Sequence, residues 1–190
     1  MSPTDFTRLS PAQLTDEFRA IARDAGEVFA GYDAGQLNWK PSADQWSMAQ
    51  CFEHLVKSEA EMSGAIARAL DPATPRTVWQ RLPFWPRLFG RLLVTSMSPG
   101  ATRKLAAPAT ARPAASDTPG DIVDRFVECQ HTLAGAVGAL APHDAARVMV
   151  SPFKTYVTYS VLDGYRIIAA HQRRHFEQAR RVTQTAGFPG

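Results

Sequence analysis

His171 and His175 stand four residues apart in the stretch HQRRHFEQ. On an α-helix this spacing places two side chains on one face, with Cβ atoms about 5–6 Å apart. Two imidazoles at that separation can bind one metal ion through bonds of about 2 Å. The alternative is a pair of core histidines whose ring nitrogens are satisfied by hydrogen bonds.

The helical positions around the pair favour an inward direction for both rings. With His171 at 0°, His175 falls at about 40° and the apolar Ile168 at about 60°. The charged side chains of the same stretch fall between about 180° and 300°. They are Arg173, Arg174, Glu177, Arg180 and Arg181. We therefore expect the charged residues on the outer face and both histidines in the interior.

The same spacing occurs in HExxH metalloproteases, in which the glutamate between the histidines acts as general base. Here Gln172 stands where that glutamate would be, and Arg173 and Arg174 follow it. The glutamate that such a protease requires is absent, so this class of enzyme is excluded.

His54 is the best candidate for a third metal ligand. It lies in WSMAQCFEHLVKSEAEM, at the border of an apolar helical stripe and one turn after Cys51. His131 lies off the apolar centre of its helix and His143 lies in the polar segment PHDAAR, so we expect both on the surface. Cys51 could also bind a metal, but we expect it to be buried as a small hydrophobic residue.

Four amphipathic segments have to position these histidines. Each begins at a residue suited to capping a helix N-terminus, and apolar residues then recur at steps of three and four. The expected caps are Ser10, Ser47, Thr118 and Ser160, and the last helix should end near Thr185. The only β-like stretch, RVMVSPFKTYVTY, is interrupted by a proline and is expected to be irregular. The predicted fold is all-α, a four-helix bundle forming a single domain over residues 1–190.

A long connection, residues 71–119, joins the second and third predicted helices and holds eight of the chain's fourteen prolines. Loops of this length are usually functional or disordered, and a crossover can change the order of the helices in a bundle. The second half, KLAAPATARPAASD, is expected to be extended and loosely ordered. The first half is aromatic, apolar and basic. We interpret it as a lid or dimer contact, which we favour over contact of residues 76–94 with an anionic membrane.

Composition limits the remaining possibilities. The net charge of +3 is too small to argue for nucleic-acid binding, which needs a concentrated basic face. The first ten residues, MSPTDFTRLS, show no secretory signal, and the two cysteines form no CxxC motif. We therefore expect a cytoplasmic protein with reduced cysteines and no nucleic-acid partner.

The segments NWKPSADQWSMAQCFEHLVKSEAEM and HQRRHFEQARRV together resemble the DinB-like superfamily, the damage-inducible, YfiT-like group of helical proteins. The family pattern has a proline, a Trp-Ser pair, a His-Leu pair about two turns on, and His-x3-His followed by a glutamine in the last helix. The matching residues are Pro41, Trp46, Ser47, His54, Leu55, His171, His175 and Gln178. The resemblance covers most of the chain.

The resemblance implies a four-helix bundle with a divalent metal, most often zinc or nickel, held by His54, His171 and His175. It also implies frequent homodimers and, among members with known chemistry, S-transferases and isomerases that use low-molecular-weight thiols, besides predicted hydrolases. We expect a metal-dependent enzyme that activates a thiol or water for attack on a small-molecule substrate. Glu61, two turns beyond His54, is the candidate general base. The alternatives are a non-catalytic metal-binding bundle and a membrane- or partner-binding module.

Overall fold

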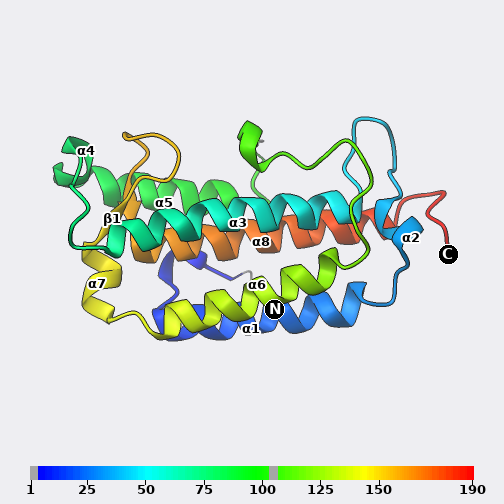
Figure 1. Ribbon diagram of the computed structural model, residues 1–190, viewed down its shortest axis with the longest axis horizontal. Coiled ribbons are helices and arrows are strands. Elements are labelled where there is room, and N and C mark those ends of the chain that lie inside the picture. Colours follow the sequence, from blue (N-terminus) through cyan, green and yellow to red (C-terminus); the bar gives the residue numbers. More distant parts are fainter. Residues whose placement is uncertain (1–3, 103–106) are drawn as a thin grey trace.

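Four long helices lie side by side along the length of the molecule (Figure 1). They are α1 (Pro11–Phe29), α3 (Met48–Leu70), α6 (Ile122–Gly138) and α8 (Val161–Thr183). The computed structural model describes residues 4–102 and 107–190, without the side chains of residues 142–144. The predicted all-α fold is confirmed, and no helix in these ranges is long and apolar enough to cross a membrane.

The direction of the helices differs from a simple up-and-down bundle. In Figure 1, α1 and α8 run one way and α3 and α6 run the other way. Each of these four helices packs against two of the other three, so α3 contacts both α6 and α8. Since α3 and α6 are parallel and successive among the long helices, the chain has to return along the bundle between them. The long connection therefore changes the helix order, as its length suggested.

The first half of the connection forms two helices, α4 (Val78–Arg81) and α5 (Trp85–Met97). One face of α5 packs on α8, where Pro86 and Val94 are buried. The two helices approach closely at Gly90, where an added Cβ would lie 2.6 Å from a carboxylate oxygen of Asp163. This segment therefore covers its own bundle with one face and exposes the other.

Residues 109–118, which we call the strap, are tied to α3 by hydrogen bonds. The Ala114 amide donates to the Glu53 carboxylate at 3.0 Å, and the Ala114 carbonyl accepts from the Gln50 side chain at 2.9 Å. The Thr118 hydroxyl donates to the same Glu53 carboxylate at 3.2 Å. The expectation of loose order is therefore wrong for the strap, because polar side chains of α3 satisfy its backbone.

Three of the four predicted helix caps are confirmed. The side chains of Ser10, Ser47 and Ser160 each accept a hydrogen bond from the backbone amide three residues later. The fourth is wrong, because α6 begins after Asp121 rather than after Thr118. The Thr118 hydroxyl belongs to the strap and is not available to cap a helix.

Short elements join the long helices. Among the described residues they are η1 (Phe6–Arg8), α2 (Ala34–Asn38), η2 (Ala109–Ala111) and α7 (Pro142–Arg147). The stretch predicted to be irregular contains two short antiparallel strands, β1 (Met149–Val150) and β2 (Tyr159–Ser160). From the second half of the long connection, residues 104–106 lie outside the described residues, as does the side chain of His143.

One prediction about the outer face of α8 is also wrong. Arg173, expected on the solvent-facing side, is mostly buried against α1. Its guanidinium pairs with Glu17 at 2.6 Å and with Asp24 at 2.5 Å. The two carboxylates come from a neighbouring helix, so the helical period of α8 alone gives no sign of them.

Aromatic rings fill the centre of the bundle. The Phe29 ring packs edge-on against Phe52 and Phe176, with centroids 5.0 and 5.1 Å apart. Phe18 is fully buried and packs edge-on against Tyr165 at 6.4 Å. Large rings in dense packing contribute stability that smaller side chains cannot replace.

We predict that Phe18→Ala lowers the free energy of unfolding by about 3–5 kcal/mol, because it leaves a ring-sized cavity in the core. Urea denaturation followed by circular dichroism measures the change. Val28→Ala is the control, because Val28 lies on the same helix and is 38% exposed. A Phe18→Ala protein as stable as the Val28→Ala protein would contradict this description of the core.

Candidate metal centre

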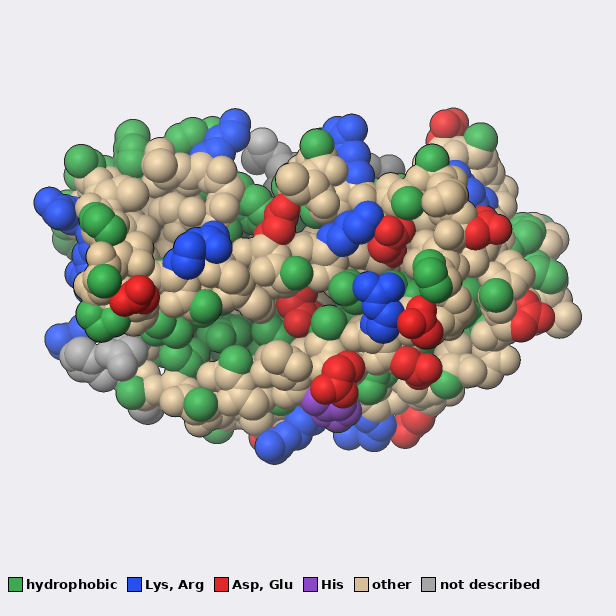
Figure 2. All heavy atoms as spheres, viewed as in Figure 1, with side chains coloured by type: hydrophobic (Ala, Val, Ile, Leu, Met, Phe, Trp, Pro, Cys, Tyr) green, Lys and Arg blue, Asp and Glu red, His purple; other side chains and the backbone are tan. Residues whose placement is uncertain are grey.

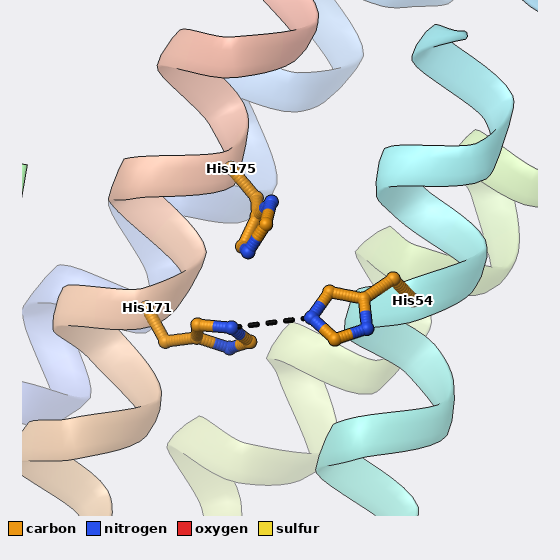
Figure 3. Close-up of side chains that lie close together, drawn as sticks. All are labelled: His54, His171 and His175. Carbon is orange, nitrogen blue, oxygen red and sulfur yellow. Dashed lines mark hydrogen bonds between the residues drawn. The ribbon is translucent and has the colours of Figure 1, made fainter. Parts of the chain in front are cut away.

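His54, His171 and His175 converge between two antiparallel helices (Figure 3). The His54 ring centroid lies 5.1 Å from that of His171 and 4.7 Å from that of His175. The centroids of His171 and His175 are 4.6 Å apart. One potential ligand atom from each residue lies within 4.8 Å of the other two. The convergence predicted from the sequence is therefore confirmed.

The helix starts and the packing of α3 on α8 produce this convergence. The Ser47 capping box fixes the first residue of α3, so His54 falls at the end of its second turn. His171 and His175 lie one turn apart near the middle of α8, on the side that faces α3. Each ring is thus carried by a rigid helix rather than by a loop.

A backbone hydrogen bond sets the tautomer of His54. The Nδ1 atom lies 2.7 Å from the carbonyl oxygen of Ala111 in the strap. A carbonyl oxygen only accepts, so Nδ1 carries the proton, and Nε2 of the neutral ring presents its lone pair to the other histidines. Histidine ligands of metals are commonly oriented in this way by a carbonyl or carboxylate at the second nitrogen.

The nitrogen positions fit a common metal ion. Nε2 of His54 and Nε2 of His171 are 3.2 Å apart (Figure 3). Two nitrogens bonded to a tetrahedral zinc at about 2.0–2.1 Å are about 3.3–3.4 Å apart, which is nearly the same separation. Without an ion, the same contact is a hydrogen bond only if His171 Nε2 carries a proton.

His175 has a second feature that fits a ligand environment. One of its ring nitrogens points toward the other two rings in Figure 3, and its Nδ1 atom is buried without a hydrogen-bond partner among the described residues. Trp46 stacks on its ring at 5.8 Å and also packs on the His54 ring at 5.0 Å. Trp46 is therefore part of the surroundings of the histidine cluster, whereas Trp39 packs on Phe188.

All three rings are held in the neutral form. Burial lowers the pKa of His54, although the hydrogen bond to Ala111 opposes the shift. Burial lowers the pKa of His175 to about 3, and the nearby His54 and Arg174 add to the effect. Burial also lowers the pKa of His171 to well below its usual value, and the electrostatic effect of His175 is the next cause. Neutral imidazoles are the form that binds metal ions.

The other described residues that the sequence offered for the site do not belong to the histidine cluster. Glu61 is half-buried and lies about 10 Å beyond His54 along the axis of α3. Its role as general base stays a prediction. Cys51 is fully buried as predicted, and burial raises the pKa of its thiol to about 12. The protonated thiol is a poor metal ligand. His131 is exposed on α6, as predicted.

A buried carboxyl next to the site was missed by the sequence analysis. Glu59 Oε2 accepts hydrogen bonds from the side-chain amides of Gln130, at 3.3 Å, and Gln172, at 3.2 Å. Burial raises the pKa of Glu59 to about 8, although the hydrogen bond from Gln130 opposes the shift. Glu59 stands among charged residues in KSEAEM, which is typical of a solvated face. The signal that could have found it is its position four residues after Leu55 and three before Met62, on the apolar stripe of the helix.

A pocket of about 370 Å³ opens beside the histidines, and Trp46 forms one of its walls. The pocket is lined by two cationic side chains, Lys40 and Arg112, and by the carboxylate of Asp44. The remaining lining residues are Ala43, Gln50, Ala107, Pro113, Ala114 and Ala115. The indole of Trp46 is thus shared between the histidine cluster and a space large enough for a small organic molecule.

A family model of the DinB superfamily matches residues 17–179. The matched region includes the three histidines, Trp46 and the whole long connection. No curated protein and no solved structure matched the chain.

The lowered pKa values predict how metal retention depends on pH. A protonated imidazole cannot bind, and burial moves the protonation of all three rings below the ordinary imidazole pKa of about 6.5, well below it for His171 and His175. We therefore expect zinc to remain bound at about pH 6 and to be released as the pH falls further toward about 4. Zinc content after dialysis across a pH series measures this. Loss between about pH 7 and 6, typical of exposed histidines, would contradict the buried geometry.

Proposed function

The chain belongs to the DinB superfamily, and we propose that it is a metal-dependent enzyme acting on a small-molecule substrate. His54, His171 and His175 are the proposed ligands of a divalent metal. The observation that carries the proposal is the convergence of three neutral imidazoles with two ring nitrogens 3.2 Å apart. Three nitrogen ligands leave coordination positions open, which is typical of catalytic rather than structural sites.

Zinc or nickel is the proposed metal. Imidazole suits borderline ions such as zinc, nickel and copper, whereas magnesium and calcium prefer oxygen ligands. No carboxylate belongs to the cluster among the described residues. When bound, the metal would supply Lewis acidity that lowers the pKa of a coordinated thiol or water.

The chain's own residues prepare the site for such a substrate. The Ala111 carbonyl holds the His54 ring in one tautomer, and Trp46 covers His54 and His175 on the side of the pocket. In the pocket, Lys40 donates to the Ala43 carbonyl at 2.8 Å. The Arg112 side chain donates to the Ala107 carbonyl at 3.4 Å. Both cations retain further donors, so we propose a substrate that carries a carboxylate, such as a low-molecular-weight thiol acid.

We expect the protein purified without an affinity tag to contain one zinc or nickel per chain, and His171→Ala to contain none. Removing one of three ligands abolishes tight binding, while the bundle keeps its core without the ion. His131→Ala is the matched control, because it removes an exposed histidine from α6. Elemental analysis measures the metal, and circular dichroism measures the helix content.

Two outcomes would contradict the proposed site. One is wild-type protein without stoichiometric metal after incubation with zinc. The other is an equal metal content in the His171→Ala and His131→Ala variants. Unfolding of the metal-free wild type would instead make the site structural and would contradict a catalytic role.

The choice between thiol and water can be tested with cobalt(II) in place of the native metal. We predict that mercaptopropionate changes the near-ultraviolet absorption of the cobalt protein, because a sulfur ligand introduces a charge-transfer band. Its apparent affinity should exceed that of cysteamine, which carries a positive charge, and Lys40→Ala should reduce the difference. An unchanged spectrum with every thiol would favour water as the activated group.

A further inference from the structure

The outer face of α4 and α5 carries exposed apolar side chains that the bundle leaves uncovered. Phe84 is 81% exposed, Leu88 is 68% exposed and Leu92 is 54% exposed. The spacing of four residues places Leu88 and Leu92 in one row along α5, and Phe84 immediately precedes that helix. Figure 2 shows apolar side chains gathered at the upper left edge, where Figure 1 places α4 and α5. We call the exposed side of these two helices the α4–α5 face.

Neighbouring aromatic residues extend the α4–α5 face. Trp79, on α4, packs against Tyr156 at 6.4 Å, and both rings are exposed. The indole of Trp85 donates to the Tyr156 carbonyl at 3.1 Å, which fixes the loop between β1 and β2 beside α5. Isolated exposed apolar residues are normal on a protein surface, but a continuous group marks a contact surface.

The segment that forms this face has charge of one sign only. Residues 72–116 contain seven of the chain's twenty-one lysines and arginines and none of its eighteen aspartates and glutamates. The rest of the chain therefore has fourteen basic and eighteen acidic side chains. The small net charge of the whole chain hides this separation, in which a basic segment is attached to an acidic body.

The arginines of the α4–α5 face are not used inside the protein. Arg81 on α4 and Arg87 on α5 are exposed, as is Arg76 just before α4, and none of the three forms an ion pair with the described residues. Arg173 in the bundle shows the opposite arrangement, with two carboxylates bound to one guanidinium. The positive charge of the α4–α5 face is therefore available to an external anion.

We propose that the α4–α5 face binds an anionic phospholipid surface, in place of the lid or dimer contact that the sequence alone favoured. With Leu88 at 0° on α5, Leu92 falls at about 40° and Arg87 at about 260°. The exposed Phe84 directly precedes the helix as its N-cap. The apolar row is thus bordered by positive charge, as in helices that lie in the plane of a membrane interface. The aliphatic part of an arginine can follow the apolar row while its guanidinium reaches a phosphate.

Charge argues against the other occupants of this face. A two-fold contact between copies of the chain would bring the same arginines of both copies together, which is unfavourable. A nucleic acid would satisfy the arginines but would leave Phe84, Leu88 and Leu92 against a polar backbone. An anionic lipid surface matches both the charge and the apolar row.

The backbone of Phe84 adds a separate observation. Its φ of 65° lies in the left-handed region, which is unfavourable for a bulky residue. Glycine would adopt this conformation without strain. The exposed ring makes no contribution to the core that would compensate for the strain, so a role outside the fold explains why an aromatic residue occupies this position.

Co-sedimentation with lipid vesicles tests the proposal with the full chain. We expect the protein to pellet with vesicles of phosphatidylcholine and phosphatidylglycerol, but not with vesicles of phosphatidylcholine alone. High salt should weaken the binding, because screening reduces attraction between arginine and lipid phosphate.

Two double variants separate charge from apolar insertion. Arg81→Gln with Arg87→Gln should weaken the partition coefficient about 25-fold, from about fivefold for each charge near an anionic surface. Leu88→Ala with Leu92→Ala should weaken it at least about tenfold through lost apolar insertion. The matched controls are Arg19→Gln and Val28→Ala on α1, which should bind like the wild type.

Phe84→Gly distinguishes a membrane role from a structural one. We expect this variant to melt at or above the wild-type temperature, because glycine relieves the strained φ, and to bind anionic vesicles more weakly. A residue that mattered only to the fold would show the opposite result, with lower stability and unchanged vesicle binding.

Three outcomes would overturn the proposal. The first is the absence of wild-type protein from the pellet with anionic vesicles at low salt. The second is equal binding to neutral and anionic vesicles. The third is a dimer by analytical ultracentrifugation that the Leu88→Ala, Leu92→Ala variant converts to a monomer, because the face would then be covered by a second copy.

Discussion

The hydrogen bond from His54 Nδ1 to the Ala111 carbonyl determines what the histidine cluster can do. It fixes the proton on the outer nitrogen, so the lone pair of Nε2 faces His171 and His175. The acceptor belongs to the strap, which Gln50 and Glu53 hold against α3. The position of His54 is thus set by its own helix, α3, whereas the orientation of its ring is set by the strap, which is distant in sequence.

Burying three imidazoles without acidic partners lowers the stability of the fold. The pKa values of all three are lowered, and a buried ring nitrogen of His175 has no partner among the described residues. Unpaired buried polar groups destabilise a fold unless a ligand satisfies them. The aromatic core around Phe29 stabilises the bundle and offsets this cost. The ion pairs of Arg173 with α1 do the same. A metal ion in the cluster would offset part of this cost by accepting one lone pair from each ring.

The sequence was sufficient for the parts of the structure that depend on local rules. Capping residues located the start of three long helices, and the helical period placed His171 and His175 on the inner face. The remaining errors involve partners that are distant in sequence. Thr118 bonds to the strap instead of capping α6, and Arg173 meets carboxylates of α1. Glu59 lies on the apolar stripe of α3, four residues after Leu55 and three before Met62, but the amides that bond its carboxylate come from α6 and α8, which the helical period of α3 does not indicate.

Zinc X-ray absorption spectroscopy of the loaded protein tests the central claim most directly, because it identifies the ligand atoms themselves. Three histidine ligands predict a shell of nitrogen and oxygen atoms at about 2.0–2.1 Å, with the outer-shell scattering of imidazole rings. A sulfur atom at about 2.3 Å would implicate Cys51 or Cys129 and contradict the account. An oxygen shell without imidazole scattering would contradict it as well.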